Sequence, residues 1–526
     1  MARLVAAASA QKALGELGGM GDALVAEPGA MLAILDLMVA EAHKKRPNDK
    51  LIDAFGFMLG EALLTLRFGV ENGHPGAAAL VTEFQQRLGA LIAGGQLDPG
   101  LAALVLQQFA SARLDPGDAV RGAVAERRDA VERPPERPDS NKLLVELAQS
   151  FGGDMFAFQA QIVEQGAAWP ETGRAGIPAA LLTTDDPALR ETALGWLLDP
   201  AATTRRETAG LLQQAAASGR LGGVALRRLI GMRNWLPPEE KPAVDDIIRI
   251  MRRKGVEPVP LDAADIRHIL VTGMDGAGAR SLFLLVKDGR KHALLSVLIK
   301  TGIGIADAWT RPGQTKVEMD RLRQRLIHEA GGFENNLAFV QTSLAHGLAL
   351  GLEAGKLPPF WLVDVIERVG LTGLNPERLE PEALVARLIE DIPAMRLEAR
   401  FLAAALRASA TWQHKLPSAE SWFEDNPTLS ALLEQKRLST KRRVALVLED
   451  YLPTRRRHWA ETLAWTAFAA RRGEPNAGGW EEVALVAREL LGDRPLAEIP
   501  VMSGIASLTV EAWEYRRDRA GRSARE

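Results

Sequence analysis

The chain has 526 residues, with 64 Lys and Arg against 67 Asp and Glu. The resulting net charge of −3 provides no general attraction to nucleic acid or to an anionic membrane. The sequence contains no cysteine, which excludes disulfides, thiolate metal sites, iron–sulfur clusters and a cysteine nucleophile. The length allows three or four domains or one long repeat array, and the abundance of Ala, Gly, Leu and Arg is typical of a high-GC bacterial coding bias.

The N-terminal segment has one Arg, and its apolar run is broken early by Gln11 and Lys12. This run is too short for the hydrophobic core of a secretory signal. No run of about 18 apolar residues occurs elsewhere, so we expect no membrane-spanning helix and a cytoplasmic location.

Residues 1–133 are expected to form an N-terminal helical bundle. Apolar residues recur there at helical spacing, and turn signals such as Asn72-Gly73 and Gly94-Gly95 separate the segments. The Pro- and charge-rich stretch 134–141 is the predicted linker, because a helix cannot run through its prolines. The expected helices of the bundle are 31–44, 51–68, 76–92 and 101–112.

Residues 142–260 continue as helices with regular openings. Asp186-Pro187 begins one helix and Pro237-Pro238 precedes another, at positions where a missing N–H costs nothing and negative charge is favoured. The expected helices are 142–151, 155–164, 187–198, 203–217, 224–235 and 239–254.

The opening Asp-Pro-x-Leu-Arg at 186–190, followed by a helix with Ala and Leu on one face, resembles HEAT-like helical repeats. The resemblance covers about 185–254, although no clean period of about 40 residues is present. It implies a stacked-helix scaffold that binds other proteins along an extended surface, and it implies no catalytic residue.

Residues 261–313 are the part of the chain with β character. Their short apolar runs end at Gly or at Asp-Gly, which favours strands over helices. Asp288-Gly289 is a strong hairpin signal, because a type I′ turn needs positive φ at both central residues. Since the runs are apolar on both faces, helices should cover at least one face. The expected strands are 268–272, 281–287 and 291–299, the last two paired antiparallel, with 303–309 as a fourth strand or a turn of helix and Arg311-Pro312-Gly313 closing the sheet.

The loop Gly273–Gly278 joins the first expected strand to the second. It follows a strand and is rich in glycine, but it lacks the G-x-G-x-x-G pattern and leads into a strand rather than a helix. Two interpretations stay open: a plain hairpin loop, or a contact with a ligand or partner. The residues considered for that contact are Asp275, Gly276, Gly278, Arg280, Asp307 and Trp309.

Residues 314–526 are expected to form a C-terminal helical array. Histidines 328, 346 and 414 lack a second ligand at helical spacing, so the sequence indicates no metal site and no cofactor. A basic cluster near aromatic residues could meet phosphates and bases, but helix ends and solvated faces explain such a cluster better. Its arginines are Arg442, Arg443, Arg455, Arg456 and Arg457.

The sequence therefore predicts a mainly α chain, an irregular α-solenoid or HEAT-like helical array with one small antiparallel β-sheet insertion near its middle. Three functions follow as hypotheses. The first is a non-enzymatic scaffold or adaptor for a protein partner, with the β module as docking site. The second is an enzyme or small-ligand-binding module centred on the loop, with Asp275, Asp288, Asp307, His268, His292 and Ser281 as available groups. The third is a nucleic-acid-associated protein that uses the basic cluster.

Overall fold

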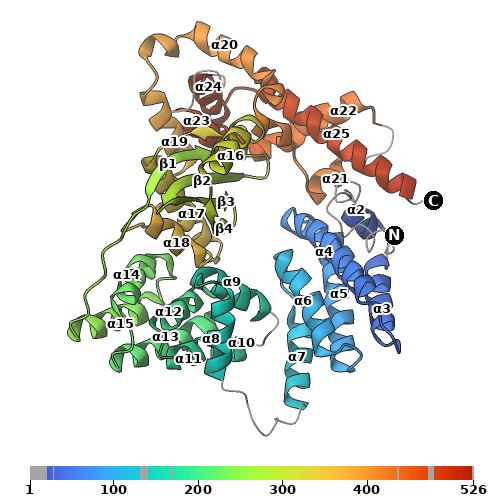
Figure 1. Cartoon of the computed structure of the whole chain (residues 1–526). Coiled ribbons are helices and arrows are strands. Elements are labelled where there is room, and N and C mark those ends of the chain that lie inside the picture. Colours follow the sequence, from blue (N-terminus) through green and yellow to red (C-terminus); the bar gives the residue numbers. More distant parts are fainter. Residues whose placement is uncertain are drawn as a thin grey trace. The chain divides into compact units, whose positions relative to one another are not determined.

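The computed structural model describes residues 20–27, 29–130, 140–166, 169, 171–434, 438–471 and 479–523. In them the chain is mostly helical, with one antiparallel sheet of five strands near the middle (Figure 1). This confirms the mainly α class with a small sheet. The chain divides into two compact units. Unit 1 comprises residues 1–180, 426–428 and 514–526, and unit 2 comprises residues 181–425 and 429–513.

Unit 1 consists of helices that pack their apolar faces together. The side chains of Asn48 and Asp98 accept hydrogen bonds from backbone N–H groups three residues further on, at 3.3 and 2.9 Å. These bonds satisfy donors that a helix start leaves without a partner. In the core, the rings of Phe84 and Phe109 have centroids 5.8 Å apart. The helices are α2 (Met20–Ala26), α3 (Ala30–Ala42), α4 (Asp49–Glu71), α5 (Pro75–Ala93), α6 (Pro99–Ser111), α7 (Asp118–Ala130), α8 (Ser140–Ser150), α9 (Met155–Gly166) and α10 (Glu171–Arg174), and α11 (Gly176–Thr183) leads into unit 2.

Unit 2 opens with short helices that are held by polar contacts. Asp186 caps the first of them by accepting from the backbone N–H of Ala188 at 2.8 Å. Arg205 makes a two-pronged ion pair with Glu240, with both N–O distances at 2.7 Å. Two of the expected helices end as 3-10 turns. The elements are α12 (Pro187–Thr192), η1 (Ala193–Leu198), α13 (Ala202–Ala217), α14 (Gly223–Met232), η2 (Arg233–Trp235) and α15 (Lys241–Arg253).

The sheet has the strand order β4-β3-β2-β1-β5, with every pair antiparallel. The predicted hairpin of the second and third strands is confirmed. Its turn consists of Gly289 and Arg290, and only Gly289, at φ 59°, has positive φ. The turn is therefore not the expected type I′, which needs positive φ at both residues. The strands are β1 (Asp265–Val271), β2 (Ala279–Asp288), β3 (Lys291–Lys300), β4 (Gly304–Gln314) and β5 (Phe333–Glu334).

The ends of the sheet differ from the prediction. β4 runs through Arg311-Pro312-Gly313, where we expected the sheet to close. Proline is tolerated there because β4 is an edge strand and loses no ladder bond on its open side. The short strand β5 carries no periodic signal and pairs with β1 over two residues only.

Helices cover both faces of the sheet (Figure 1). On one face, Leu270, Leu285 and Leu294 pack with Met319 of α16 (Lys316–His328). The other face carries Leu282, Leu284 and further apolar residues against α17 (Leu337–Glu353) and α18 (Trp361–Arg368). Since apolar side chains on both faces need cover, the sheet becomes the interior of unit 2.

The remaining helices follow the sheet in the sequence. In α23 (Arg456–Ala470) every residue from Trp459 to Ala470 is buried, so this helix is part of the core of unit 2. The other elements are α19 (Pro381–Glu390), η3 (Ala394–Leu397), α20 (Ala399–Ser409), η4 (Trp412–His414), η5 (Pro417–Ser421), α21 (Pro427–Leu433), α22 (Thr440–Leu446), η6 (Val447–Tyr451), η7 (Leu452–Arg455), α24 (Trp480–Leu491), η8 (Leu496–Glu498) and α25 (Pro500–Ser523).

Two other expectations concern the linker and the membrane. Residues 134–139 of the predicted linker lie outside the described residues, and Ser140 begins α8. Within the described ranges, no single helix is both long and apolar enough to cross a membrane. The bent pair α2 and α3 meets the length and composition test only when its two helices are joined across a 105° bend.

Replacing Gly276 with alanine is expected to destabilise unit 2. An added Cβ would lie 2.1 Å from the backbone oxygen of Ser421, and backbone cannot give way as a flexible side chain can. We expect a loss of about 1–3 kcal/mol in the free energy of unfolding, measured by urea titration. The control is Gly210→Ala in α13, where a Cβ meets nothing within 4 Å and alanine should add about 0.5–1 kcal/mol. Equal stability of the two variants would contradict the close approach.

Candidate functional site

The loop Gly273–Gly278 is docked against the chain's own C-terminal half. The backbone N–H of Met274 donates to Oγ1 of Thr466 at 3.1 Å, and its carbonyl accepts from Nε1 of Trp422 at 2.9 Å. Nε2 of His458 donates to the carbonyl of Gly276 at 3.0 Å. Gly276 and Gly278 are buried, so these two glycines offer little surface to a partner.

Asp275 closes the turn of this loop from within. Its Oδ1 accepts from the backbone N–H of Ala279 at 2.7 Å, and Ala277 and Gly278 donate to it as well. Burial raises the pKa of Asp275, and those hydrogen bonds act in the opposite direction. The carboxylate thus holds the loop in shape.

The structure does not bring Arg280 together with Asp307 and Trp309. Arg280 pairs with Ile299 in the sheet register, whereas Asp307 pairs with the next residue, Leu298. Since successive side chains point to opposite faces, Arg280 lies on one face and Asp307 on the other. Trp309 is on the face of Asp307, within the apolar cluster under α16.

The arginines of the basic cluster have partners within the chain. Arg456 caps backbone carbonyls, that of Leu490 at 2.7 Å among them. These contacts give each arginine a partner within the chain, while the side chains of Arg442 and Arg457 stay about half exposed. The other contacts are Arg442 with Glu449, Arg443 with the ring of Trp513, Arg455 with Glu424, and Arg457 with Glu380 and Glu382.

The histidines of the sheet stand apart from the aspartates considered for catalysis. Nδ1 of His268 lies 3.4 Å from Oε1 of Glu334. His292 pairs with Gln314, about 20 Å along β3 from Leu298, the partner of Asp307. The arrangement that would favour an enzyme at the loop, a histidine beside Asp275 or Asp307, therefore has no support from these positions.

A different site lies on the face of the sheet to which Arg280 points. There, side chains from four separate segments meet in the interior of unit 2. They come from β2, α17, the irregular segment before α19, and α23. We call this group the Arg280 cluster, and its members are Arg280, Ser343, His346, Arg378, Glu461 and Trp465.

Arg280 is the centre of the cluster. It is 2% exposed, and its guanidinium carbon lies 3.7 Å from the ring centroid of Trp465. Stacking on an indole suits a guanidinium, which is planar and weakly hydrated. Burial lowers the pKa of Arg280 to about 9, an effect that the charge of Glu461 opposes. The side chain is therefore a buried cation at neutral pH.

Several buried polar atoms in the cluster lack hydrogen-bond partners among the residues that the structure describes. An unsatisfied buried polar group costs about 1–3 kcal/mol, and a charged one costs more. Five of these atoms belong to Arg280, Glu461 and Trp465, which lie together, and the sixth lies on Ser343, one helical turn before His346. Such a group calls for a physical explanation. The atoms are Nε, Nη1 and Nη2 of Arg280, Oγ of Ser343, Oε1 of Glu461 and Nε1 of Trp465.

The ring of His346 is fully buried, and its neighbours fix its tautomer. Nδ1 accepts from the backbone N–H of Leu379 at 3.1 Å, so the proton of the neutral ring sits on Nε2. Nε2 lies 3.1 Å from Nη1 of Arg378 and 3.7 Å from Oε1 of Glu461. Because Nε2–H and the guanidinium are both donors, both groups face the negative charge of Glu461, although neither is within hydrogen-bond distance of Oε1. Burial lowers the pKa of His346 to about 2, and Arg280 and Arg378 act in the same direction.

Glu461 supplies the negative charge of the cluster. Oε1 is 3.6 Å from Nη1 of Arg378, too far for a good hydrogen bond. Burial raises the pKa of Glu461, against the effect of Arg378 and Arg280. Arg378 also lies 3.3 Å from Glu380 on its outer side. The cluster is thus an ion network whose inner end, at Arg280, has no hydrogen-bonded partner.

A second buried carboxylate of the same unit, Glu424, has its hydrogen bonds satisfied and serves as a comparison. It accepts from Nε1 of Trp459 at 2.9 Å, Nε of Arg455 at 2.9 Å and the hydroxyl of Tyr451 at 3.2 Å. The hydrogen bonds of Glu424 are therefore satisfied within the chain, whereas those of the polar atoms around Arg280 are not.

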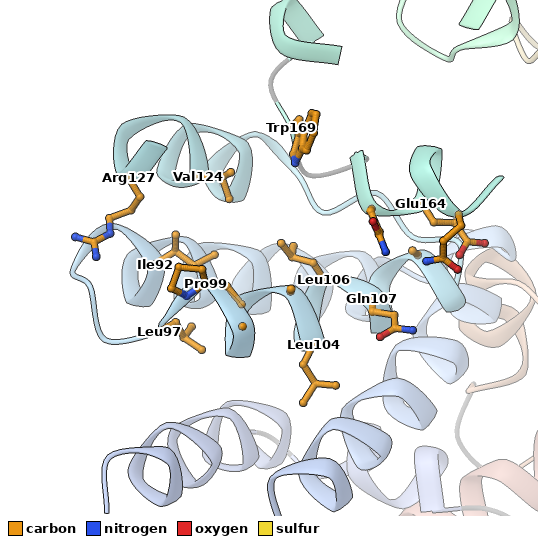
Figure 2. Close-up of a pocket in the computed structure, with 16 residues that line it drawn as sticks. Ile92, Leu97, Pro99, Leu104, Leu106, Gln107, Val124, Arg127, Glu164 and Trp169 are labelled. Atoms are coloured by element: carbon orange, nitrogen blue, oxygen red, sulfur yellow. The ribbon is translucent and has the colours of Figure 1, made fainter. Parts of the chain in front are cut away.

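Two of the cavities in the described part of the chain can be compared with this cluster, and Arg280 itself is among the residues that line the second. One of about 740 Å³ in unit 1 is lined largely by apolar side chains of α6 and its neighbours, with Trp169 and Glu164 at its border (Figure 2). The other, of about 250 Å³, lies beside the loop and brings Asp275 near Ser281 and Ser418. Neither gathers buried charges as the Arg280 cluster does. Among the residues described, no three His, Asp or Glu side chains gather closely enough to hold a metal ion.

Sequence reasoning named Arg280 but missed the rest of the cluster. His346, Arg378 and Glu461 belong to segments that read as ordinary helix or loop. One usable signal was present: Glu461 lies inside the helical run Trp459–Ala470, whose other positions are apolar or small. A carboxylate in such a run is unusual unless it has a buried partner.

Comparisons with known proteins give relatives of undetermined function. Residues 170–255 match the family described as Y4lR second domain, and residues 382–514 match the Y4lR C-terminal helical domain. The chain is similar to the uncharacterized protein y4lR of Sinorhizobium fredii (strain NBRC 101917 / NGR234), at 28% identity over 475 residues, covering 87% of each chain. No solved structure matches.

The buried ring of His346 predicts sensitivity to acid. Because folding lowers its pKa from 6.5 to about 2, its contribution to stability is complete above pH 6.5 and is lost as pH falls below that value. In His346→Asn the amide oxygen can still accept from Leu379 but does not titrate. We expect the difference in unfolding free energy, variant minus wild type, to rise by about 2 kcal/mol as the pH falls from 7 to 5, measured by urea unfolding. If the unfolding free energies of the wild type and the variant changed by the same amount with pH, this account would be contradicted.

Proposed function

We propose that this chain is a ligand-binding helical protein whose site is the Arg280 cluster. The observation that carries the proposal is the concentration of unpartnered buried polar atoms on Arg280 and on its neighbours Trp465 and Glu461. A ligand held there would supply their hydrogen bonds and lower the cost of burying Arg280. This is the small-ligand interpretation of the β module, moved from the loop to the interior face of the same sheet.

Binding is a better description of the cluster than catalysis. A general acid or base works best with a pKa near the working pH. His346 has its pKa lowered to about 2, so its ring stays neutral and does not exchange a proton near neutral pH. Arg280 stays protonated under the same conditions. These groups can orient a ligand through hydrogen bonds and charge without transferring protons.

A second proposal keeps the scaffold interpretation. The helices α12–α15 would form part of a HEAT-like array that binds a protein partner. The supporting observation is local: Asp186 caps α12 at the Asp-Pro opening, and α13 packs against both η1 and α15. Such stacking of neighbouring helices is what an array of this kind requires.

The ligand proposal predicts a specific response in Arg280→Met. After exhaustive dialysis, the variant should be at least as stable as the wild type, because replacing an unpaired buried cation with an apolar side chain can add about 1–4 kcal/mol. The low-molecular-mass filtrate of the source cells should raise the melting temperature of the wild type and leave the variant unchanged. Arg455→Met is the matched control, since Arg455 belongs to the satisfied site at Glu424 and should keep the response. Identical responses of wild type and Arg280→Met would overturn the proposal.

The scaffold proposal is tested on the other face of the sheet. Asp307→Arg reverses a charge at the docking position expected from the sequence, and Asp262→Arg is an exposed control just outside the sheet. If the β module docks a partner at Asp307, quantitative capture from the source cells should lose that partner in Asp307→Arg only. Deleting the module is not a usable test, because the sheet is the interior of unit 2. Equal recovery with both variants would count against docking at Asp307.

A further inference from the structure

We propose that the ligand of the Arg280 cluster is a small planar oxyanion with one negative charge, of the carboxylate kind. This inference rests on the proposed function, because it names the chemistry of the ligand held at that site. Four features of the cluster support it: its excess of donors, the orientation of Arg280, its charge, and its cover.

Donors outnumber acceptors among the unpartnered atoms. The guanidinium of Arg280 carries five N–H groups and the indole of Trp465 carries one. Ser343 can donate or accept through its hydroxyl. Oε1 of Glu461 is the acceptor in the set, and it already lies within 3.7 Å of two donors, Arg378 and His346. The missing partner is therefore an acceptor.

The stacking of Arg280 fixes where that acceptor binds. Trp465 lies against the face of the guanidinium, at 3.7 Å from its carbon. The N–H groups lie in the plane of the guanidinium and point outward from its edge. An anion with two oxygens in one plane can accept two parallel hydrogen bonds from such an edge. A spherical halide cannot form that pair of bonds.

Among the cations of the cluster, Arg280 is the one whose guanidinium has no hydrogen-bonded carboxylate. Arg280 and Arg378 are cations, and Glu461 is the carboxylate that they share, with a pKa raised by burial. On its outer side Arg378 has a second carboxylate, Glu380, at 3.3 Å. Arg280 has no such partner of its own. A ligand with one negative charge would give Arg280 a hydrogen-bonded anion of its own, and further charge on the ligand would add to its repulsion from Glu461.

The cover over the cluster limits the ligand to a small size. The irregular segment Leu371–Glu380 crosses α17 and is held by backbone bonds from Glu377 to Ala345 at 3.0 Å and from Leu379 to His346 at 3.1 Å. Its other end is held by Nε1 of Trp235, which donates to the carbonyl of Leu374 at 3.0 Å. Beneath this cover His346, Ser343 and Trp465 have essentially no exposed surface. A ligand of a few heavy atoms suits this enclosure better than a large one.

The test compares sodium formate with formamide, a neutral molecule of nearly the same shape, and with sodium chloride at matched ionic strength. The whole chain is dialysed, and its melting temperature is followed while each compound is added. We expect formate to raise the melting temperature of the wild type and of Arg455→Met by at least about 2 °C at saturation. Formamide and chloride should have no such effect, and Arg280→Met should not respond to formate.

A variant with altered charge separates binding from a structural role. Glu461→Gln keeps the shape of the side chain and removes the negative charge that repels an anion. We expect it to bind formate roughly 3–10-fold more tightly than the wild type does, measured by calorimetry. A purely structural Glu461 would leave the affinity unchanged or weaken it through loss of folding.

The contrary outcomes distinguish this inference from the proposed function. If formamide stabilises the wild type as well as formate does, the ligand is neutral and the oxyanion inference fails, while the ligand-binding proposal stands. If formate stabilises Arg280→Met as much as the wild type, the anion binds elsewhere and the inference fails. If neither formate nor the cell filtrate distinguishes the wild type from Arg280→Met, the proposed function itself fails.

Discussion

The architecture of unit 2 depends on one constraint, namely that its sheet is apolar on both faces. Such a sheet cannot leave one side to water, and helices must be packed on each. The first face takes α16, which follows directly in the sequence. The second face is covered by α17 and α18, and α23 packs against the polar end of that face, at Arg280. The loop Gly273–Gly278 fixes the position of α23 through His458 and Thr466.

Covering the second face also encloses charge. Two buried carboxylates, Glu424 and Glu461, lie on either side of the start of α23 in the sequence, but their surroundings differ. Glu424 accepts hydrogen bonds from donors at 2.9 Å, whereas Nη1 of Arg378 lies 3.6 Å from Oε1 of Glu461. A protein under selection for stability alone would gain by replacing an unsatisfied ion cluster with apolar side chains. The presence of an unsatisfied ion cluster in the interior therefore supports the proposal of a functional role.

Much of the fold could be read from the sequence because its signals are local. Alternating glycine and apolar runs placed the hairpin, and the pair Asp186-Pro187 placed a helix start that the side chain of Asp186 caps. The sequence placed the turn at Asp288-Gly289, one residue before the observed turn of Gly289 and Arg290. The type of turn is set by the twist of both strands rather than by the dipeptide alone. Strand β5 has two residues and no periodicity, and its pairing with β1 is a tertiary event.

The site could be read only in part. Arg280 was a candidate because it follows a glycine-rich loop. Its partners His346, Arg378 and Glu461 are brought to it by the packing of α17, the segment before α19, and α23. No sequence-spacing rule relates these positions. Each residue lies in a segment whose own sequence pattern is explained without reference to the other two. The expected grouping with Asp307 and Trp309 failed for a register reason: strand neighbours one residue apart point to opposite faces.

The bond between His458 and the loop at Gly276 joins residues 182 positions apart in the sequence. During synthesis, a ribosome adds about 5–20 residues per second, so the loop waits roughly 10–35 s before its partner exists. During that interval α16, α17 and α18 are already made and can cover the apolar faces, whereas the end of the sheet at Arg280 still lacks α23. The nascent chain therefore passes through a stage in which Arg280 and the neighbouring loop are exposed, and chaperones would meet them there.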